Sequence, residues 1–221
     1  MASPADEHPL INIKISIIPS SYAFTEQSPP TMVLELTSHA EVPITFATWG
    51  SPLDIGSALT RNGFIIIDRA TESAIPTTQT MVQRGALMRI RGTFDERYLL
   101  TLEPHVSVTL STPFGRNGSG VKPQPKAVVQ RGWELDEHGN ERKIRRSSKA
   151  TGVDGLEPGH QYLVRLNHEL LKQCKWTRAR KDEVLIDRSE MGSKSSHMQD
   201  YPWETSPLKF CTNDAFLSIL E

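Results

Sequence analysis

Histidine side chains are the first candidates for chemistry in this chain, because imidazole binds metals and transfers protons near neutral pH. A zinc hydrolase motif places two histidines four residues apart on one helix, with a glutamate after the first. The chain has no such motif. His160 and His168 lie at the two ends of one strand-like stretch, too far apart to share a metal. We expect all seven histidines to lie at the surface or in turns: His8, His39, His105, His138, His160, His168 and His197.

Phosphate-binding and nucleophilic motifs are also missing. The glycine-rich stretch FGRNGSGVK, residues 114–122, has no Gly-Lys-Ser/Thr, and Pro123 and Pro125 prevent the helix that a P-loop requires. We therefore expect a flexible loop there. No Gly-x-Ser-x-Gly is present, and Cys174 and Cys211 fall in stretches typical of small core side chains. The sequence thus predicts no catalytic residue, no cofactor and no metal site, and it favours a protein that is not an enzyme.

A basic segment, residues 141–149, is the clearest local charge pattern. Its basic side chains are Arg142, Lys143, Arg145, Arg146 and Lys149. Such a segment can be a nuclear-import signal, contact phosphate groups or direct a kinase to Ser147 or Ser148. It can also be the charged edge of a hairpin, where charge prevents pairing with another sheet. The acidic stretch WELDEHGNE lies opposite, so we favour the hairpin edge and keep the first four basic residues as interaction candidates.

Aromatic side chains near the end of the chain offer a second interaction candidate. Tyr201 and Trp203 lie in the stretch DYPWE, which has the polar character of a surface loop. Aromatic residues anchor protein interfaces. They also close loops over a protein's own core, and we favour this second interpretation.

Composition limits the classes of partner. The chain has 221 residues, with 25 basic and 26 acidic side chains and a formal net charge of −1. This balance gives no overall field that would attract nucleic acid or an anionic membrane. Two cysteines do not make a disulfide framework, the N-terminal stretch is acidic, and no apolar run approaches the ~20 residues of a membrane span. We expect a soluble cytoplasmic protein, with the nucleus as an alternative, that binds another protein.

The elements that must position these residues are short strands. Apolar residues alternate with polar ones in residues 10–18, 32–38, 44–49, 98–102, 106–110 and 162–166, and residues 64–71 contain a more apolar strand. Residues 183–187 and 207–211 are further strand candidates. A hairpin is predicted over residues 128–146 with its turn at residues 138–140. Short helices are predicted over residues 54–63 and 167–176, capped by Asp54 and Asn167.

Two Leu-Glu-Pro turns, at residues 102–104 and 156–158, each precede a strand. Proline fixes φ and has no N–H, so it suits the corner before a strand. Many short alternating strands with little helix predict an all-β antiparallel sandwich. We expect one domain over residues 1–221, with a long hairpin and loop insertion at 113–151 and an irregular C-terminal extension at 177–221. The predicted core residues are Ile13, Ile15, Leu34, Leu36, Phe46, Leu100, Leu102, Val108, Tyr162 and Val164.

The order of these pieces resembles known immunoglobulin-like sandwiches. The matching positions are Leu34, Leu36, Pro43, Ile44, Thr45, Asp68, Leu102, Pro104, Leu156, Pro158, Gly159, Tyr162 and Val164. The pattern is similar to bacterial intracellular proteinase-inhibitor domains, to the pro-region of fungal deuterolysin-type metalloproteases, and to small fungal proteins with that sandwich. It covers residues 10–112 and 152–168. The resemblance implies an immunoglobulin-like sandwich and a binding role, and no protease zinc motif follows it in the chain.

Two classes of function therefore stay open. The first is a β-sandwich that binds another protein, in one version as a proteinase inhibitor. The second is a small enzyme or ligand-binding protein whose site combines residues that are distant in the sequence. A pocket with convergent polar groups would favour the second class.

Overall fold

Most regular structure in the chain is β-strand, as the alternating pattern predicts. The computed structural model describes residues 8–26, 28–76, 82–115, 125–126, 131–143, 152–153 and 155–221. A four-stranded sheet has the order β13 (Lys209–Thr212), β1 (Leu10–Ile18), β3 (Thr31–Ser38) and β8 (Ser107–Pro113). A five-stranded sheet has the order β2 (Ser21–Tyr22), β14 (Ala215–Ile219), β11 (Gln161–Leu166), β5 (Phe64–Asp68) and β6 (Ser73–Ala74).

Smaller elements complete the fold. A three-stranded sheet has the order β12 (Lys175–Thr177), β4 (Ile44–Ala47) and β7 (Leu99–Leu102), and β9 (Trp133–Leu135) pairs with β10 (Glu141–Lys143). Short α-helices that lie fully within the described residues are α1 (Ile55–Ala58), α3 (His168–Lys172) and α4 (Lys181–Val184). The 3-10 helices are η2 (Leu59–Arg61), η3 (Phe94–Tyr98), η4 (Arg188–Glu190) and η5 (Met198–Asp200). Within the described residues, no helix is long and apolar enough to span a membrane.

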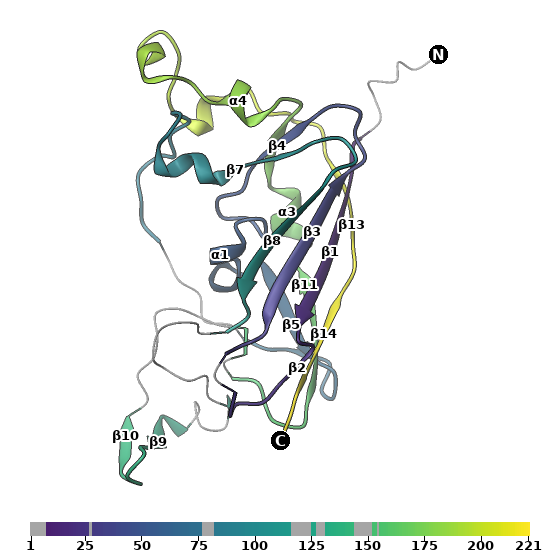
Figure 1. The fold of residues 1–221 in the computed structure, drawn as a ribbon, viewed down its shortest axis with the longest axis vertical. Coiled ribbons are helices and arrows are strands. Elements are labelled where there is room, and N and C mark those ends of the chain that lie inside the picture. Colours follow the sequence, from purple (N-terminus) through teal and green to yellow (C-terminus); the bar gives the residue numbers. More distant parts are fainter. Residues whose placement is uncertain are drawn as a thin grey trace.

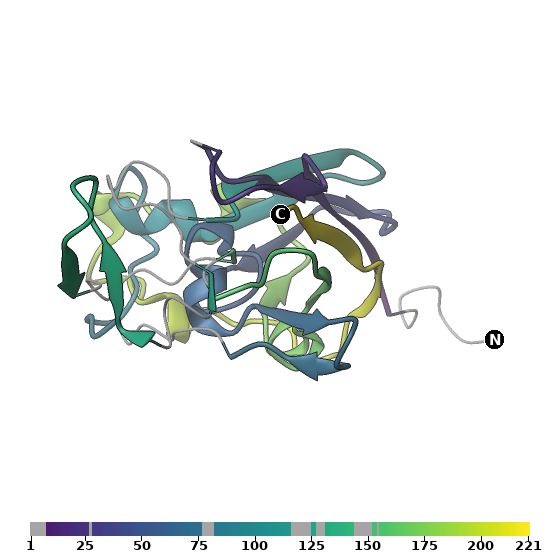
Figure 2. The same cartoon turned by 90° about the horizontal axis from the view of Figure 1, so that it is seen from below.

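One apolar core joins the sheets. Figures 1 and 2 show the four-stranded sheet on one side of the molecule and β5, β11 and β14 on the other. The inward face of β1 consists of Ile11, Ile13, Ile15 and Ile17, all buried, because successive side chains of a strand point to opposite faces. All ten predicted core residues belong to this cluster, with Leu100 and Val108 partly buried at its margin. Val106 was predicted on the same face as Val108 but is 54% exposed, since it lies in the turn before β8.

Both Leu-Glu-Pro turns come directly before strands. The first connects β7 to β8, which lie in different sheets, and Leu102 is buried. The second leads into β11, where Gly159 has a φ of 78° that suits glycine. The backbone N–H of Glu157 donates to the hydroxyl of Tyr162 over 2.8 Å. The corner is thus fixed by a side chain of the strand that it introduces.

The segment after Trp176 is more ordered than the predicted irregular extension. β13 pairs with β1 and β14 pairs with both β11 and β2, so this segment completes two sheets. Between these strands, the side chain of Asn213 accepts from Ile15 N over 2.8 Å and donates to Ile15 O over 3.0 Å. The strand predicted at 183–187 is wrong, because Lys181–Val184 forms α4. Glu183 there accepts from the backbone N–H of Arg180, a helix-start contact.

A second, smaller apolar cluster lies beside the main core. Its buried members are Leu99, Val184, Leu185 and Met198. Arg89 connects the segments around it, because its guanidinium donates to the carbonyls of Val184, over 2.7 Å, and of Ser195, over 2.9 Å. The segment from Arg84 to Ile90 is therefore anchored at one end in this cluster. Its other end reaches the pocket described next.

Candidate functional site

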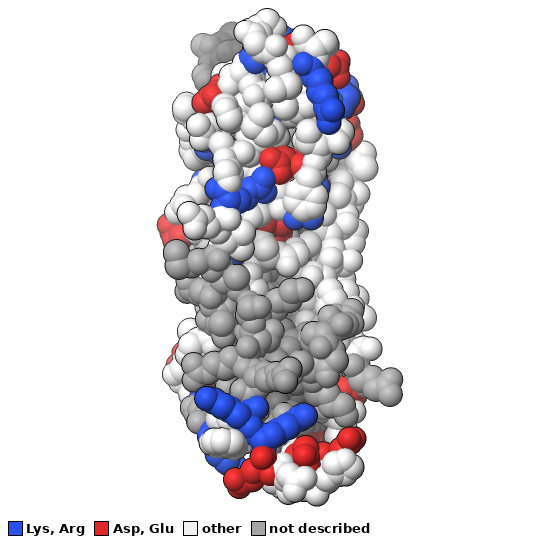
Figure 3. All heavy atoms as spheres, turned by 90° about the vertical axis from the view of Figure 1, so that its left-hand side faces the viewer, with Lys and Arg blue, Asp and Glu red and all other residues white. Residues whose placement is uncertain are grey.

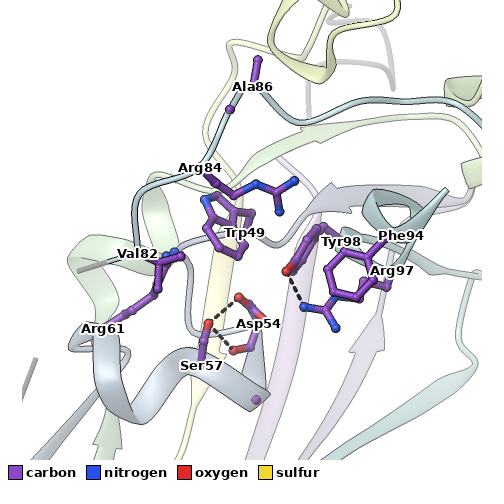
Figure 4. A pocket seen from close by; sticks show the side chains of 12 residues that line it. Trp49, Asp54, Ser57, Arg61, Val82, Arg84, Ala86, Phe94, Arg97 and Tyr98 are labelled. Atoms are coloured by element: carbon purple, nitrogen blue, oxygen red, sulfur yellow. Dashed lines mark hydrogen bonds between the residues drawn. The ribbon is translucent and has the colours of Figure 1, made fainter. Parts of the chain in front are cut away.

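A pocket of about 720 Å³ opens between three parts of the chain. These are the helical turns α1 and η2, the segment 82–86, and η3. Its labelled side chains surround one opening in Figure 4, with Trp49 between Arg84 and the Asp54–Ser57 pair. Trp49 is the second residue after β4, and Tyr98 ends η3 just before β7. Since β4 and β7 are neighbours in one sheet, the sheet brings these two aromatic residues together.

Backbone and ring contacts fix the floor of the pocket. The N–H of Thr48 donates to the carbonyl of Tyr98 over 2.8 Å, and the Thr48 hydroxyl donates to the same oxygen over 3.2 Å. The rings of Trp49 and Tyr98 meet edge to face with centroids 4.8 Å apart. Gly50, with a φ of 77°, then turns the chain towards α1. Tyr98 is buried, so its ring is a rigid support for the groups above it.

Three arginines lie against these aromatic rings. Arg61 stacks over Trp49 at 3.9 Å from the ring centroid, and Arg84 lies over the same ring at 4.9 Å. Arg97 lies over Phe94 at 3.7 Å and over Tyr98 at 4.7 Å, and it donates to the Tyr98 hydroxyl. Guanidinium groups stack favourably on aromatic faces. The rings therefore gather three positive charges at one opening.

Only one of these charges is balanced by an acidic residue of the described chain. Arg84 donates to Asp95 over 2.6 Å, and the Asp95 side chain is 10% exposed. The second oxygen of Asp95 accepts from the backbone N–H of Met88 over 2.9 Å. Among the described residues, neither Arg61 nor Arg97 forms an ion pair. Arg61 and Arg97 thus have no ion-pair partner among these residues, and the pocket keeps a net positive charge even with the carboxylate of Asp54 in its lining.

Asp54 and Ser57 form the polar end of the pocket. The Ser57 hydroxyl donates to the Asp54 carboxylate, and the Ser57 backbone N–H donates to the Asp54 carbonyl over 2.9 Å. The predicted cap is wrong in detail, because Asp54 precedes α1 without a side-chain bond to a backbone N–H of the helix. The Ser57 hydroxyl faces a carboxylate, so this pair differs from the serine–histidine arrangement in which an imidazole takes the proton of the nucleophile.

Two apolar side chains stand at the mouth of the pocket. Phe94 is 67% exposed and Val82 is 49% exposed, and both line the opening. Large apolar side chains with this exposure next to Trp, Tyr and Arg have the composition of an interface anchor. The arrangement can hold a ligand that combines an anionic group with an apolar part. A cationic ligand is disfavoured, because the chain's own arginines already occupy the ring faces.

The predicted basic residues lie elsewhere. Arg142 and Lys143 belong to β10, and the β9–β10 hairpin confirms the predicted turn. Figure 3 shows basic beside acidic side chains at the lower end of the molecule, where Figure 1 places this hairpin. The backbone N–H of Asn140 and, more weakly, the charge of Arg142 hold the pKa of Asp136 below its usual range. Arg145, Arg146 and Lys149 lie outside the described residues, so their role stays a prediction.

Tyr201 and Trp203 pack against the second apolar cluster. Their ring centroids are 4.9 Å apart, and the indole N–H of Trp203 donates to the carbonyl of Met198 over 2.8 Å. Arg89 lies over the Tyr201 ring at 5.4 Å. Both aromatic side chains have contacts within the chain that hold the loop, and their use by a partner stays a prediction.

Asp68 and His160 form a carboxylate–imidazole pair. Nδ1 of His160 lies 2.9 Å from Oδ2 of the buried Asp68. Burial acts to raise the pKa of Asp68, but the hydrogen bonds from His160 and from the backbone N–H of Ala70 outweigh burial and lower the pKa. In the described part of the chain, no hydroxyl or thiol bonds to the His160 ring, and no three His, Cys, Asp or Glu residues gather as metal ligands. The pair is suited to hold β5 against the turn before β11.

The sequence patterns singled out none of the three pocket arginines. They are distributed from residue 61 to residue 97 and belong to no local motif. The stretch FDERY, with an arginine between two aromatic residues, is the only local signal, and it is a weak one. No known protein-family model matches the chain, and a comparison with curated proteins finds no match either.

Proposed function

We propose that this protein is a binding module that recognises an anionic segment of another protein through the pocket around Trp49. The observation that carries the proposal is the net positive charge of the pocket, where Arg61 lies over Trp49 and Arg97 lies over the exposed ring of Phe94. Arginine and aromatic side chains contribute most of the binding energy in many interfaces. Charge and apolar surface at one opening therefore support recognition of a partner protein rather than catalysis of a reaction.

The fold proposed for this module is an immunoglobulin-like sandwich. Two observations support it: sheets on opposite sides of one core, and a tyrosine hydroxyl bonded to the corner before its own strand, as in the tyrosine corner of such domains. The resemblance to intracellular proteinase-inhibitor domains supports a narrower version in which the partner is a proteinase. Two free cysteines, one of them exposed, are compatible with the proposed cytoplasmic or nuclear location.

A small-molecule site is the second candidate, favoured by the size of the cavity. Pockets that enclose small ligands have volumes of roughly 300–1,000 Å³, and this one measures about 720 Å³. The exposed Phe94 and Val82 at its mouth favour a partner surface instead, because a small-molecule site usually buries its apolar lining.

The proposal is tested by crosslinking and capture from the protein's own cells with three versions of the chain. These are the wild type, Arg97→Glu, and Arg69→Glu as the control. Arg69 also lies over an exposed aromatic ring, Phe216, at 5.4 Å, but outside the pocket. We expect a protein that the wild type and Arg69→Glu capture and that Arg97→Glu loses. Equal capture by all three versions would contradict a partner role for the pocket.

A further inference from the structure

β8 is an outer strand that lacks the usual protection of a sheet edge. It has seven residues, SVTLSTP, and none of them is charged. The other outer strands of the three larger sheets have two to four residues each: β2, β6, β7, β12 and β13. Proteins normally keep edge strands short or place charge on them, because unpaired backbone groups bind other chains. The length and neutrality of β8 therefore mark a place where a further strand can add.

The contacts of β1 determine which backbone groups of β8 face outward. The side chain of Asn213 bonds to both N and O of Ile15, on the β13 side of β1. Backbone groups of successive strand residues point to alternate sides. Leu34, which pairs with Ile15, therefore directs its own groups away from β1 and towards β8, where it pairs with Leu110. Leu110 thus bonds to β3, and its neighbour Thr109 directs its N–H and C=O to the open edge.

Ser111 shares this outward orientation, because it lies two positions after Thr109. A second contact agrees with it. The N–H of Phe114 donates to the carbonyl of Pro30, just before β3, over 2.7 Å, so even-numbered positions here face β3. In the described part of the chain, no hydrogen bond occupies the backbone N–H or C=O of Thr109 or Ser111, and both residues are exposed. The edge offers their two donors and two acceptors to another strand.

The pocket lies next to this edge. α1, which lines the pocket with Gly56 and Ser57, also packs against β8, and Figure 1 shows α1 beside β8 on the side away from β3. Ala58 of α1 belongs to the same core as Leu110, so α1 lies on the core side of the sheet. Every second side chain of an added strand points to that side. An acidic side chain there is directed towards α1 and the net positive pocket that α1 lines.

We infer that the partner protein binds as an added strand: an extended segment pairs with the open edge of β8, and an acidic side chain on its core-facing side points towards the pocket. This inference rests on the proposed function and adds the conformation of the recognised segment. Val108 and Leu110 support it, because both are only partly buried at the margin of the core and a further strand would cover them. In strand addition, main-chain hydrogen bonds give affinity and side-chain pockets give specificity.

A second copy of the chain is a poorer occupant of this edge. Two copies that pair through β8 must bring their sheets edge to edge, and α1 lies beside that edge in both of them. An extended segment needs only the width of one strand, about 5 Å. The inference therefore commits to an extended segment of another protein.

The inference is tested with random peptides displayed on phage, long enough to pair with all of β8 and selected against the full chain. We expect the enriched peptides to contain Asp or Glu and to lack a central proline, which cannot donate to β8. A synthetic enriched peptide is then titrated against the chain, with amide hydrogen exchange followed by NMR. In the free chain the N–H groups of Thr109 and Ser111 should exchange faster than that of Leu110. Bound peptide should slow both by roughly 10-fold or more, while exchange at Thr212, on the opposite edge of the sheet, stays the same.

Two variants at one position separate the backbone from the side chain. Thr109→Pro removes an outward N–H that β3 does not use, and it should weaken peptide binding by roughly 5-fold or more, the value of one hydrogen bond. Thr109→Ala keeps that N–H and should bind within about 2-fold of the wild type. Arg97→Gln should also weaken binding by roughly 5-fold or more, because it removes a positive charge from the pocket. Urea midpoints show whether each variant is folded, and the exchange measurement on the wild type depends on no variant.

Four outcomes would overturn the inference. Selection that enriches no peptide would remove its basis. Peptides whose binding depends on Arg97 but leaves exchange at Thr109 and Ser111 unchanged would refute strand addition and leave the proposed function standing. Binding that Thr109→Pro weakens and Arg97→Gln does not would separate the edge from the pocket and contradict the proposed function as well. A wild-type dimer in sedimentation that Thr109→Pro converts to a monomer would assign the edge to a second copy.

Discussion

The burial of the ion pair between Arg84 and Asp95 sets how much stability its removal should cost. Asp95 accepts from Arg84 over 2.6 Å and from the backbone N–H of Met88 over 2.9 Å. Its side chain is 10% exposed and that of Arg84 is 26% exposed. Alanine at position 95 removes both bonds and leaves a partly buried N–H and a partly buried charge without a partner. The two losses amount to about 2.5–6 kcal/mol, and access of water to Arg84 favours the lower half of this range.

Asparagine at the same position should cost less. Asp95→Asn keeps an oxygen that can accept from Met88 and loses mainly the charge opposite Arg84, so we expect a cost of about 1–3 kcal/mol. Asp95→Ala should therefore lower the free energy of unfolding more than Asp95→Asn does. Both are measured by urea unfolding at neutral pH, with an unchanged slope as the sign of an intact two-state transition.

An exposed pair of the same chemistry provides the control. Asp182 bonds to Arg91 over 2.7 Å, but these side chains are 71% and 44% exposed, and Arg91 also contacts Asp187. Asp182→Ala should cost no more than about 1 kcal/mol, since water and Asp187 replace the lost contact. A loss for Asp95→Ala no larger than that for Asp182→Ala would refute the view that Asp95 anchors the pocket wall.

Three further predictions concern the rest of the fold. The pKa of Asp68 is lower in the folded chain than its ordinary 3.8, so its contribution to stability is present above about pH 4 and is lost as pH falls through the folded pKa. Asp68→Asn should therefore be less stable than the wild type at neutral pH, and the difference should shrink below pH 4 in urea titrations. A difference that stays constant with pH would contradict this. Leu102→Ala should destabilise by about 2–5 kcal/mol, because Leu102 is fully buried in the main core, and an unchanged melting temperature would show that this site tolerates a cavity. Alanine at Arg145 and Arg146 should leave the cellular location unchanged if the basic segment is only a charged hairpin edge, and loss of a nuclear signal in microscopy would favour an import role.

The strands were predictable wherever apolar and polar residues alternate cleanly. Burial alternates along the whole of β1 and β3, and the cap at Asn167 is confirmed by its bonds to Glu169 N and Leu170 N. β14 was not predicted, since Phe216, 54% exposed, interrupts the apparent period between the buried Ala215 and Leu217. Three-dimensional pairing with β11 overrides that local pattern.

The pocket could not have been predicted from sequence patterns. Arg61 and Arg84 are placed by the ring of Trp49, which lies at a distance along the chain, whereas only Arg97 lies over rings that are its neighbours in sequence. Local patterns report the period of a strand or a helix, and they carry no information about which surface residues meet across loops. The sequence drew attention instead to the residues with dense local charge, such as Arg142 and Lys143, which lie on a separate hairpin.

The pairing of β1 with β13 means that the first sheet cannot be completed until the end of the chain has been synthesised. Ile15 and Asn213, which bond to one another, are 198 positions apart. At about 5–20 residues per second, a ribosome needs roughly 10–40 s to add the residues that separate them. During that time β1 can pair with β3, but its other edge stays open, and open strand edges associate with other chains. The nascent chain is therefore most vulnerable to aggregation before β13 emerges, and a factor that shields the first strand during translation would raise the yield of folded protein.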